Sequence, residues 1–351
     1  MKITYSGDRL KDRINPSTSW HKCLGLLRVD PERSFMHCIK GWSVRLSSRR
    51  NLGAVEWVKF ARGGAEMEIK MIGVVGAGQM GSGIAEVALT SGFNVLMRDV
   101  TMEAVQKGRL RIVTDFDRRI QKGKMTATEK EAILQRLSTT IKMEDFKNCD
   151  FIIEAAIENI PLKWDIFRKL DEVTRKETIL ASNTSSIAIT RIASVTQRPD
   201  RVIGMHFFNP APVMKLIEIV RGLVTSDETF HITRDLSLKM RKTPLEANDF
   251  PGFISSRLIF SYMNEAIYTF YEGLGKAEDI DAIMKMGANH PMGPLELADL
   301  VGLDTVLSVM SVLQEAFGDK YRPCPLLTKY VEAGYLGVKM GRGFYSYGEK
   351  K

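Results

Sequence analysis

The chain has 351 residues, of which 44% are hydrophobic, and it carries a formal net charge of +8. This much apolar material excludes a disordered protein and is enough for the cores of two domains. No stretch approaches the roughly 18 apolar residues of a membrane-spanning helix, and the N-terminus lacks the short apolar block of a secretory signal. We therefore expect a cytoplasmic protein that does not bind membranes.

Most of the positive charge lies in residues 1–66, which contain 13 Lys and Arg against 6 Asp and Glu, a net charge of +7. The rest of the chain is close to neutral at +1, so we predict no nucleic-acid-binding surface on it. Three interpretations of this basic leader compete: a disordered extension, an organelle-targeting leader, or residues upstream of the true start. Its six acidic residues argue against a transit peptide. We expect the leader to lie outside the fold.

The four cysteines are scattered and lack the spacing of a disulfide framework or a zinc ribbon; they are Cys23, Cys38, Cys149 and Cys324. Reduced thiols in a cytosol-like compartment fit this pattern. His21 and His37 lie near the first two cysteines, but in a segment without a metal-site pattern. We therefore predict no metal site.

The first expected strand, Met71–Val75, runs into a glycine-rich turn with the spacing Gly-x-Gly-x-x-Gly and then into a helix over 82–90. Gly76 permits the tight turn, Gly78 lets the backbone approach a pyrophosphate, and Gly81 lets the helix pack closely on the sheet. Together with Gln79 and Met80, these glycines are the candidate cofactor-binding loop. The alternative is a glycine turn that binds nothing.

A second expected strand, Val95–Met97, is followed by Asp99, 18 residues after Gly81. An acidic residue at this place accepts hydrogen bonds from the adenosine ribose, and its charge repels a 2′-phosphate. The pattern therefore favours NAD over NADP as the cofactor. Arg98 leaves NADP open, because an arginine beside the ribose can bind a 2′-phosphate.

Short β-branched runs then alternate with helical stretches, which is typical of parallel strands with crossover helices. The further strand candidates are Phe151–Glu154, Thr178–Ser182 and Arg201–His206. Two polar helices are expected between Thr101 and Arg136, interrupted at 122–124. The fold predicted for 67–250 is an α/β domain with a Rossmann-like doubly wound sheet.

Beyond Pro251 the pattern changes to long amphipathic helices without strand candidates. The expected helices cover 257–271, 277–286 and 294–317. We therefore predict an all-α C-terminal domain over 251–351.

His206 ends an apolar run, and a proline-bearing turn separates it from a strand-like run over 213–220. If the turn centres on Pro212, His206 lies directly opposite Glu218 in an antiparallel pair, with their Cβ atoms about 5 Å apart. A carboxylate that orients an imidazole makes a general acid and base. The alternative is a buried histidine satisfied by backbone, with Glu218 facing solvent. The nearby dinucleotide motif favours catalysis, because a hydride acceptor requires a base for the alcohol proton.

The segment from His206 to Glu218, His-Phe-Phe-Asn-Pro-Ala-Pro-Val-Met-Lys-Leu-Ile-Glu, resembles the signature of the 3-hydroxyacyl-CoA dehydrogenases. The segment 287–299, Gly-Ala-Asn-His-Pro-Met-Gly-Pro-Leu-Glu-Leu-Ala-Asp, with Gly302-Leu-Asp304, resembles the short-chain 3-hydroxybutyryl-CoA branch. The resemblance covers about 69–347 and excludes the leader. It implies reversible oxidation of an (S)-3-hydroxyacyl-CoA with NAD in fatty-acid or butanoate metabolism, and a homodimer formed through the C-terminal domain.

The resemblance also implies roles for individual residues. His206 corresponds to the catalytic base and Glu218 to its orienting carboxylate. Ser185 corresponds to the serine that meets the substrate's 3-oxygen; its alternative role is the N-cap of a helix beginning near Ile187. Asn209 corresponds to a residue of the nicotinamide and substrate pocket, although it also suits a turn.

Four charged residues correspond to further contacts in the family. Glu158 and Lys163 correspond to cofactor contacts, although the residues alone would suit an ordinary charged helix start. Lys339 corresponds to a cofactor contact from the helical domain. Lys122 lies where the family's inserted helices meet the CoA phosphates; its alternative is a solvated surface lysine.

One position departs from the family pattern. Where the family has Pro-Gly-Phe, two apolar residues and then Asn-Arg, this chain has Ser256 in place of the active-site asparagine. Loss of a preorganised donor can cost about 2.7–4 kcal/mol of transition-state stabilisation. Two alternative functions stay open: a dehydrogenase of a free hydroxy acid or sugar acid on the same fold, as in gulonate-type relatives, and a non-catalytic NAD-binding protein, which Ser256 makes conceivable.

Overall fold

The computed structural model describes residues 68–348, which belong to one compact unit, Met67–Lys351. The predictions for residues 1–66, including those for His21, Cys23, His37 and Cys38, lie outside the described residues. Within the described range, none of the helices has the length and apolar character required to cross a membrane.

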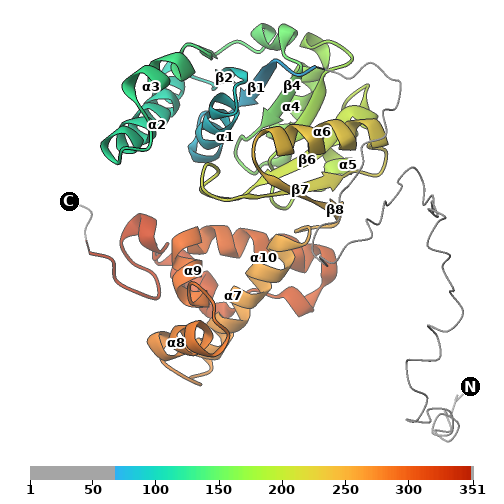
Figure 1. Ribbon diagram of the computed structural model, residues 1–351. Helices are drawn as coiled ribbons and strands as arrows, with labels where there is room; N and C mark the ends of the chain where they lie inside the picture. Colours follow the sequence, from blue (N-terminus) through green and yellow to red (C-terminus); the bar gives the residue numbers. More distant parts are fainter. Residues whose placement is uncertain (1–67, 349–351) are drawn as a thin grey trace, which may run out of the picture. The chain divides into compact units, whose positions relative to one another are not determined.

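Eight strands form one sheet in the order β3-β2-β1-β4-β5-β6-β7-β8 (Figure 1). The strands are β1 Met71–Val75, β2 Asn94–Arg98, β3 Leu137–Thr140, β4 Phe151–Glu154, β5 Ile179–Ser182, β6 Val202–Phe207, β7 Leu216–Arg221 and β8 Thr243–Asn248. Strands β1 to β6 pair in parallel, β7 is antiparallel to β6, and β8 is parallel to β7. The first six strands have the doubly wound dinucleotide-binding order, which confirms the predicted fold class.

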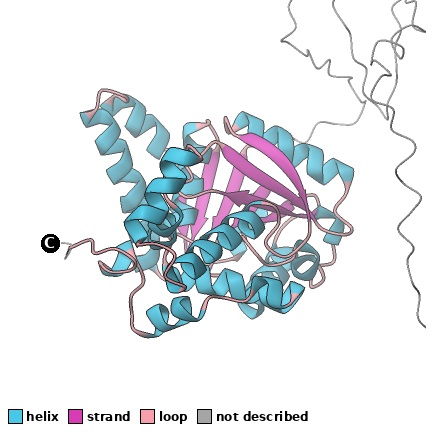
Figure 2. Ribbon diagram, turned by 90° about the horizontal axis from the view of Figure 1, so that it is seen from below, coloured by secondary structure: helices cyan, strands magenta, loops and turns pink. Residues whose placement is uncertain are grey.

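Helices cover both faces of this sheet (Figure 2). They are α1 Gln79–Thr90, α2 Met102–Gln121, α3 Ala127–Leu134, α4 Ile160–Val173, α5 Ile189–Ala193 and α6 Asp227–Lys239, with short 3₁₀ turns η2 Glu144–Asn148 and η3 Pro199–Arg201. Side chains alternate along β1: Ile72 and Val74 join the core cluster shared with α1 and α2, while Val75 joins the cluster shared with α4 and α5. Burial on both faces explains why the strands read as apolar runs.

The residues after 250 form helices around a third core cluster. The helices are α7 Ser255–Tyr271, α8 Ala277–Gly287, α9 Pro294–Val301, α10 Leu303–Phe317 and α11 Pro325–Glu332, with 3₁₀ turns η4 Asp319–Tyr321 and η5 Val338–Met340. The predicted single helix over 294–317 is wrong. Gly302, with φ of 102°, separates α9 from α10 in a conformation that favours glycine.

Two strands at the sheet edges were not predicted. Strand β3, Leu-Ser-Thr-Thr, is short and polar, and β8 contains Pro244 and mostly exposed side chains. Strand β7 begins at Leu216 rather than Val213, because the backbone N–H groups of Val213 and Met214 both donate to Pro210 O in a turn. Edge strands lack the apolar pattern of the sheet centre, so their sequences carry little strand signal.

Candidate active site

The glycine loop follows β1. This strand lies between β2 and β4, at the point where the strand order reverses. Gly76 has φ of 104°, and a Cβ atom there would lie 2.6 Å from Ala155 O. A Cβ atom at Gly81 would overlap Gly76 O at the start of α1. The loop's own fold therefore requires both glycines. Gly76 permits the turn, as predicted, whereas the close approach at Gly81 is to the loop backbone at Gly76.

Gly78 is different, because a Cβ atom there would meet nothing within 4 Å. Its open side lies at the N-terminus of α1, where the first backbone N–H groups have no helical partners and attract anions. Gln79 and Met80 are the first residues of this helix. The loop therefore fits a pyrophosphate, as the NAD prediction requires.

Asp99 follows β2 and holds the glycine loop. Its Oδ2 atom accepts from Ala77 N at 2.7 Å, and its Oδ1 atom accepts from Val100 N at 2.7 Å. Each carboxylate oxygen keeps a lone pair for a ribose hydroxyl. Arg98 donates from Nε to the backbone oxygen of Ile141, the residue directly after strand β3, at 3.1 Å.

The imidazole of His206 and the carboxylate of Glu218 form a buried pair. The two residues lie opposite each other in the antiparallel β6–β7 register, as predicted from the turn. The Nδ1–Oε2 distance is 2.9 Å, and the residues are 8% and 3% exposed. An ionised carboxylate only accepts, so Nδ1 carries the proton and Nε2 is left as the basic atom.

The carboxylate of Glu218 also accepts from the start of the helical region. Ile254 N donates at 3.1 Å and Ser255 N at 2.9 Å to Oε1, while the Ser255 hydroxyl donates to Oε2. Burial alone would raise the pKa of Glu218, but hydrogen bonds from His206 and Ser255 outweigh burial and lower it. Glu218 is therefore ionised at neutral pH.

Two loops approach the dyad from neighbouring parts of the sheet edge. Asn209 Oδ1 accepts from Gln79 Nε2 at 3.0 Å, which joins the loop after β6 to the glycine loop. Asn183 Oδ1 accepts from Phe207 N at 2.8 Å, which joins the loop after β5 to the end of β6. The predicted base and the predicted cofactor loop are thus brought together.

Ser185 lies in that loop after β5 and is not a helix cap. Helix α5 begins at Ile189 with Ala188 as its N-cap, so the capping alternative is wrong. The hydroxyl of Thr184 instead accepts from Ile187 N at 2.9 Å. The backbone N–H of Ser185 donates to Glu158 Oε1 at 3.2 Å.

The remaining predicted site residues have these surroundings. Lys163 is 1% exposed and its Nζ lies 2.7 Å from Glu154 and 3.4 Å from Glu158. Lys339 pairs with Asp304. Lys122 is exposed at the end of α2, and Ser256 is buried in the first turn of α7. Their cofactor and substrate contacts stay predictions.

Lys242, which is 7% exposed, was not predicted as part of the site. Its ammonium donates to Ala211 O at 2.5 Å and Met214 O at 2.7 Å, and so holds the turn that follows Asn209. Burial lowers the pKa of Lys242, and the nearby Glu86 carboxylate opposes that effect. A single lysine in a polar stretch does not reveal such a role, because its partners are backbone carbonyls.

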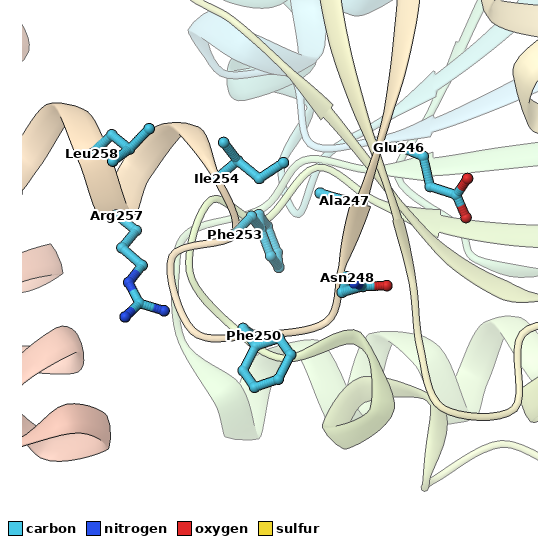
Figure 3. Close-up of a pocket in the computed structure, with 8 residues that line it drawn as sticks. All are labelled: Glu246, Ala247, Asn248, Phe250, Phe253, Ile254, Arg257 and Leu258. Carbon is cyan, nitrogen blue, oxygen red and sulfur yellow. The ribbon is translucent and has the colours of Figure 1, made fainter. Parts of the chain in front are cut away.

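A pocket of about 670 Å³ lies where β8 continues into α7 (Figure 3). It is lined by Glu246, Ala247, Asn248, Phe250, Phe253, Ile254, Arg257 and Leu258. His206 and Glu218 are not among these residues; Phe253, whose ring centroid is 6.2 Å from that of His206, connects the pocket to the dyad. The pocket therefore lies at the link between the sheet region and the helical region after residue 250.

A doubly wound sheet with a dinucleotide loop and a carboxylate-oriented histidine at the same edge defines a dehydrogenase of the Rossmann class. The family described as "3-hydroxyacyl-CoA dehydrogenase, NAD binding domain" matches residues 71–250, and "3-hydroxyacyl-CoA dehydrogenase, C-terminal domain" matches 252–347. The chain belongs to the 3-hydroxyacyl-CoA dehydrogenase family.

Individual relatives agree with this assignment. The chain is 56% identical over 285 residues to a probable 3-hydroxybutyryl-CoA dehydrogenase of Bacillus subtilis, covering 81% of this chain and 99% of the relative. It is 51% identical over 280 residues to a 3-hydroxybutyryl-CoA dehydrogenase of Bradyrhizobium diazoefficiens, covering 80% and 96%. The crystal structure of (S)-3-hydroxybutyryl-CoA dehydrogenase from Ralstonia eutropha is similar with a TM-score of 0.78 and 48% identity, covering 80% of this chain and 100% of that chain.

The lowered pKa of Glu218 predicts a pH-dependent contribution to stability. Its folded pKa lies below the ordinary value of 4.5, so the stabilisation is complete above pH 4.5 and is lost as pH falls through the folded pKa. In urea unfolding, Glu218→Gln should cost about 1–3 kcal/mol near neutral pH, and the difference from wild type should shrink at acid pH. Glu131→Gln, at an exposed position of α3, is the control for the substitution itself. A cost for Glu218→Gln that is constant with pH would contradict the assignment.

Proposed function

We propose that this chain catalyses the reversible, NAD-dependent oxidation of (S)-3-hydroxyacyl-CoA to 3-oxoacyl-CoA, with 3-hydroxybutyryl-CoA as the principal substrate. Family membership and the names of the relatives support the reaction class. The observation that carries the proposal is the buried His206–Glu218 pair at 2.9 Å, joined to the glycine loop through Asn209 and Gln79.

In this mechanism Nε2 of His206 accepts the proton of the 3-hydroxyl group as a hydride leaves C3. Bound NAD supplies the hydride acceptor. Glu218 stabilises the imidazolium that forms, because its charge lies next to Nδ1–H. Ser185 and Asn209 hold the substrate oxygen. In the reverse direction His206 returns the proton to that oxygen.

The other assignments belong to the same proposal. The cofactor is held by Gly76, Gly78, Gln79, Met80, Gly81, Asp99, Glu158, Lys163 and Lys339, and the substrate by Ser185, Lys122 and Ser256. The reaction would serve fatty-acid or butanoate metabolism. A cytoplasmic location is supported by two free, buried thiols, Cys149 and Cys324.

Replacing the base should remove turnover but not cofactor binding. With acetoacetyl-CoA and NADH, wild type should consume NADH, and His206→Gln should lower kcat by about 10²–10⁴-fold, because general base catalysis is lost. NADH binding, followed by fluorescence titration, should change little. Equal turnover with acetoacetate would favour a free hydroxy acid substrate, and wild-type NADH binding without turnover would indicate a non-catalytic protein.

Ser256→Asn should give equal or higher kcat/KM with acetoacetyl-CoA, since it restores an amide donor where the family has one. Ser256→Ala is the matched control, because it removes the hydroxyl without adding an amide. A roughly tenfold drop for the asparagine variant, about 1.4 kcal/mol, would show that the serine is adapted to this chain's own substrate.

We also propose a homodimer formed through the helical region. Large apolar side chains are exposed around α8, with Leu274 at 72%, Ile283 at 64% and Met286 at 81%. Ile283 and Met286 are three residues apart on α8 and therefore share a face, and an apolar face exposed to solvent typically marks a protein interface. Sedimentation should give about twice the chain mass of 39.5 kDa. Met286→Glu should shift the mass toward the monomer, whereas Leu110→Glu on α2 should not; a monomeric wild type would refute the dimer.

A further inference from the structure

Glu154, the last residue of β4, is a fully buried carboxylate to which the proposed mechanism gives no role. Its Oε1 atom accepts from Ala156 N at 2.7 Å and from Lys163 Nζ at 2.7 Å. Its Oε2 atom accepts from Lys163 Nζ at 2.9 Å and from the Ser182 hydroxyl at 2.6 Å. All four bonds come from β5, α4 and the loop after β4, so Glu154 is fixed at the carboxyl edge of the sheet.

Lys163 connects this carboxylate to a second one. Its ammonium lies within 2.9 Å of both oxygens of Glu154 but 3.4 Å from Oε2 of Glu158. Glu154 and Lys163 are buried, whereas the Glu158 side chain is 34% exposed. Lys163 is therefore held mainly by Glu154, and Glu158 is only a secondary partner.

The other oxygen of Glu158 holds the segment that contains Ser185. Glu158 Oε1 accepts from Ser185 N at 3.2 Å, from the Ser186 hydroxyl at 3.1 Å and from the Thr184 hydroxyl. Three charged side chains thus link the end of β4 to the loop after β5. The link passes through Lys163 and Glu158 and ends at Ser185. The proposed function assigns cofactor contacts to the first two residues and a substrate contact to Ser185.

A buried ammonium requires a compensating negative charge, because its desolvation in the protein interior is costly. Glu154 supplies that charge here. Without it, the only other carboxylate within reach of Lys163 among the described residues is Glu158. Lys163 would then draw Glu158 into a full ion pair and away from the three donors of 184–186.

We propose that Glu154 is a positioning residue for the reaction: by compensating Lys163, it keeps Glu158 on segment 184–186 and so fixes Ser185. The inference rests on the proposed function for the roles of Glu158 and Ser185. It assigns Glu154 no contact with substrate or cofactor.

The test compares Glu154→Gln with Asp150→Asn. Asp150 lies just before β4, at the opposite end of the strand, where it accepts from Lys70 N and Met71 N and pairs with Arg175, so it is a matched structural control. In folded protein, Glu154→Gln should weaken NADH binding at least about threefold and lower kcat with acetoacetyl-CoA about tenfold or more, as expected for misplaced contact groups. Asp150→Asn should lower Tm and leave both values at the wild-type level.

Glu154→Asp keeps the charge but shortens its reach, so its NADH affinity and kcat should lie between those of wild type and Glu154→Gln. If Glu154→Gln does not fold, Glu154→Asp decides the question by itself. Wild-type values in either folded variant would overturn the proposal, because the role would then be purely structural. Equal defects in the two variants would also overturn it, because charge would not be the cause.

The NADH titration separates this proposal from the proposed function, because it does not require turnover. If wild type fails to reduce acetoacetyl-CoA while Glu154→Gln still weakens NADH binding, the proposed substrate is wrong and the positioning of Glu158 stands. If wild type turns over and Glu154→Gln matches it, the positioning role is wrong and the reaction stands.

Discussion

The ionised carboxylate of Glu218 is the constraint on which the site depends. It accepts hydrogen bonds from His206 on one side and from Ile254 and Ser255 on the other. A single side chain of β7 therefore orients the imidazole and anchors the first turn of α7. The tautomer of the histidine and the attachment of the helical region are two results of the same buried charge.

Carboxylates at other strand ends hold loops in a similar way. Asp99 after β2 holds the glycine loop, and Glu154 at the end of β4 holds Lys163. In a parallel sheet these ends meet at one edge, where backbone N–H groups and charged side chains are brought together. The carboxylates of Asp99 and Glu154 therefore bind groups of the protein itself, and so hold the segments that are proposed to contact the ligands.

The sequence allowed prediction of features that depend on local pattern. The glycine spacing gave the loop, and the position of Pro212 gave the register that pairs His206 with Glu218. The edge strands β3 and β8 were missed because they lack an apolar period. Glu154 was missed for another reason: it reads as the end of an apolar strand, and its partners become visible only when α4 folds back onto the sheet.

The pairing of β6 with β7 also limits how the intervening segment can change during evolution or engineering. Side chains alternate between the two faces of a sheet, so a shift of one residue in either strand would turn the glutamate to the face opposite the histidine. The turn over 208–215 can change its composition or bulge outward only if the pairing of 204–207 with 217–220 is kept. Length changes that shift this register would separate Glu218 from His206 even if every active-site residue were retained.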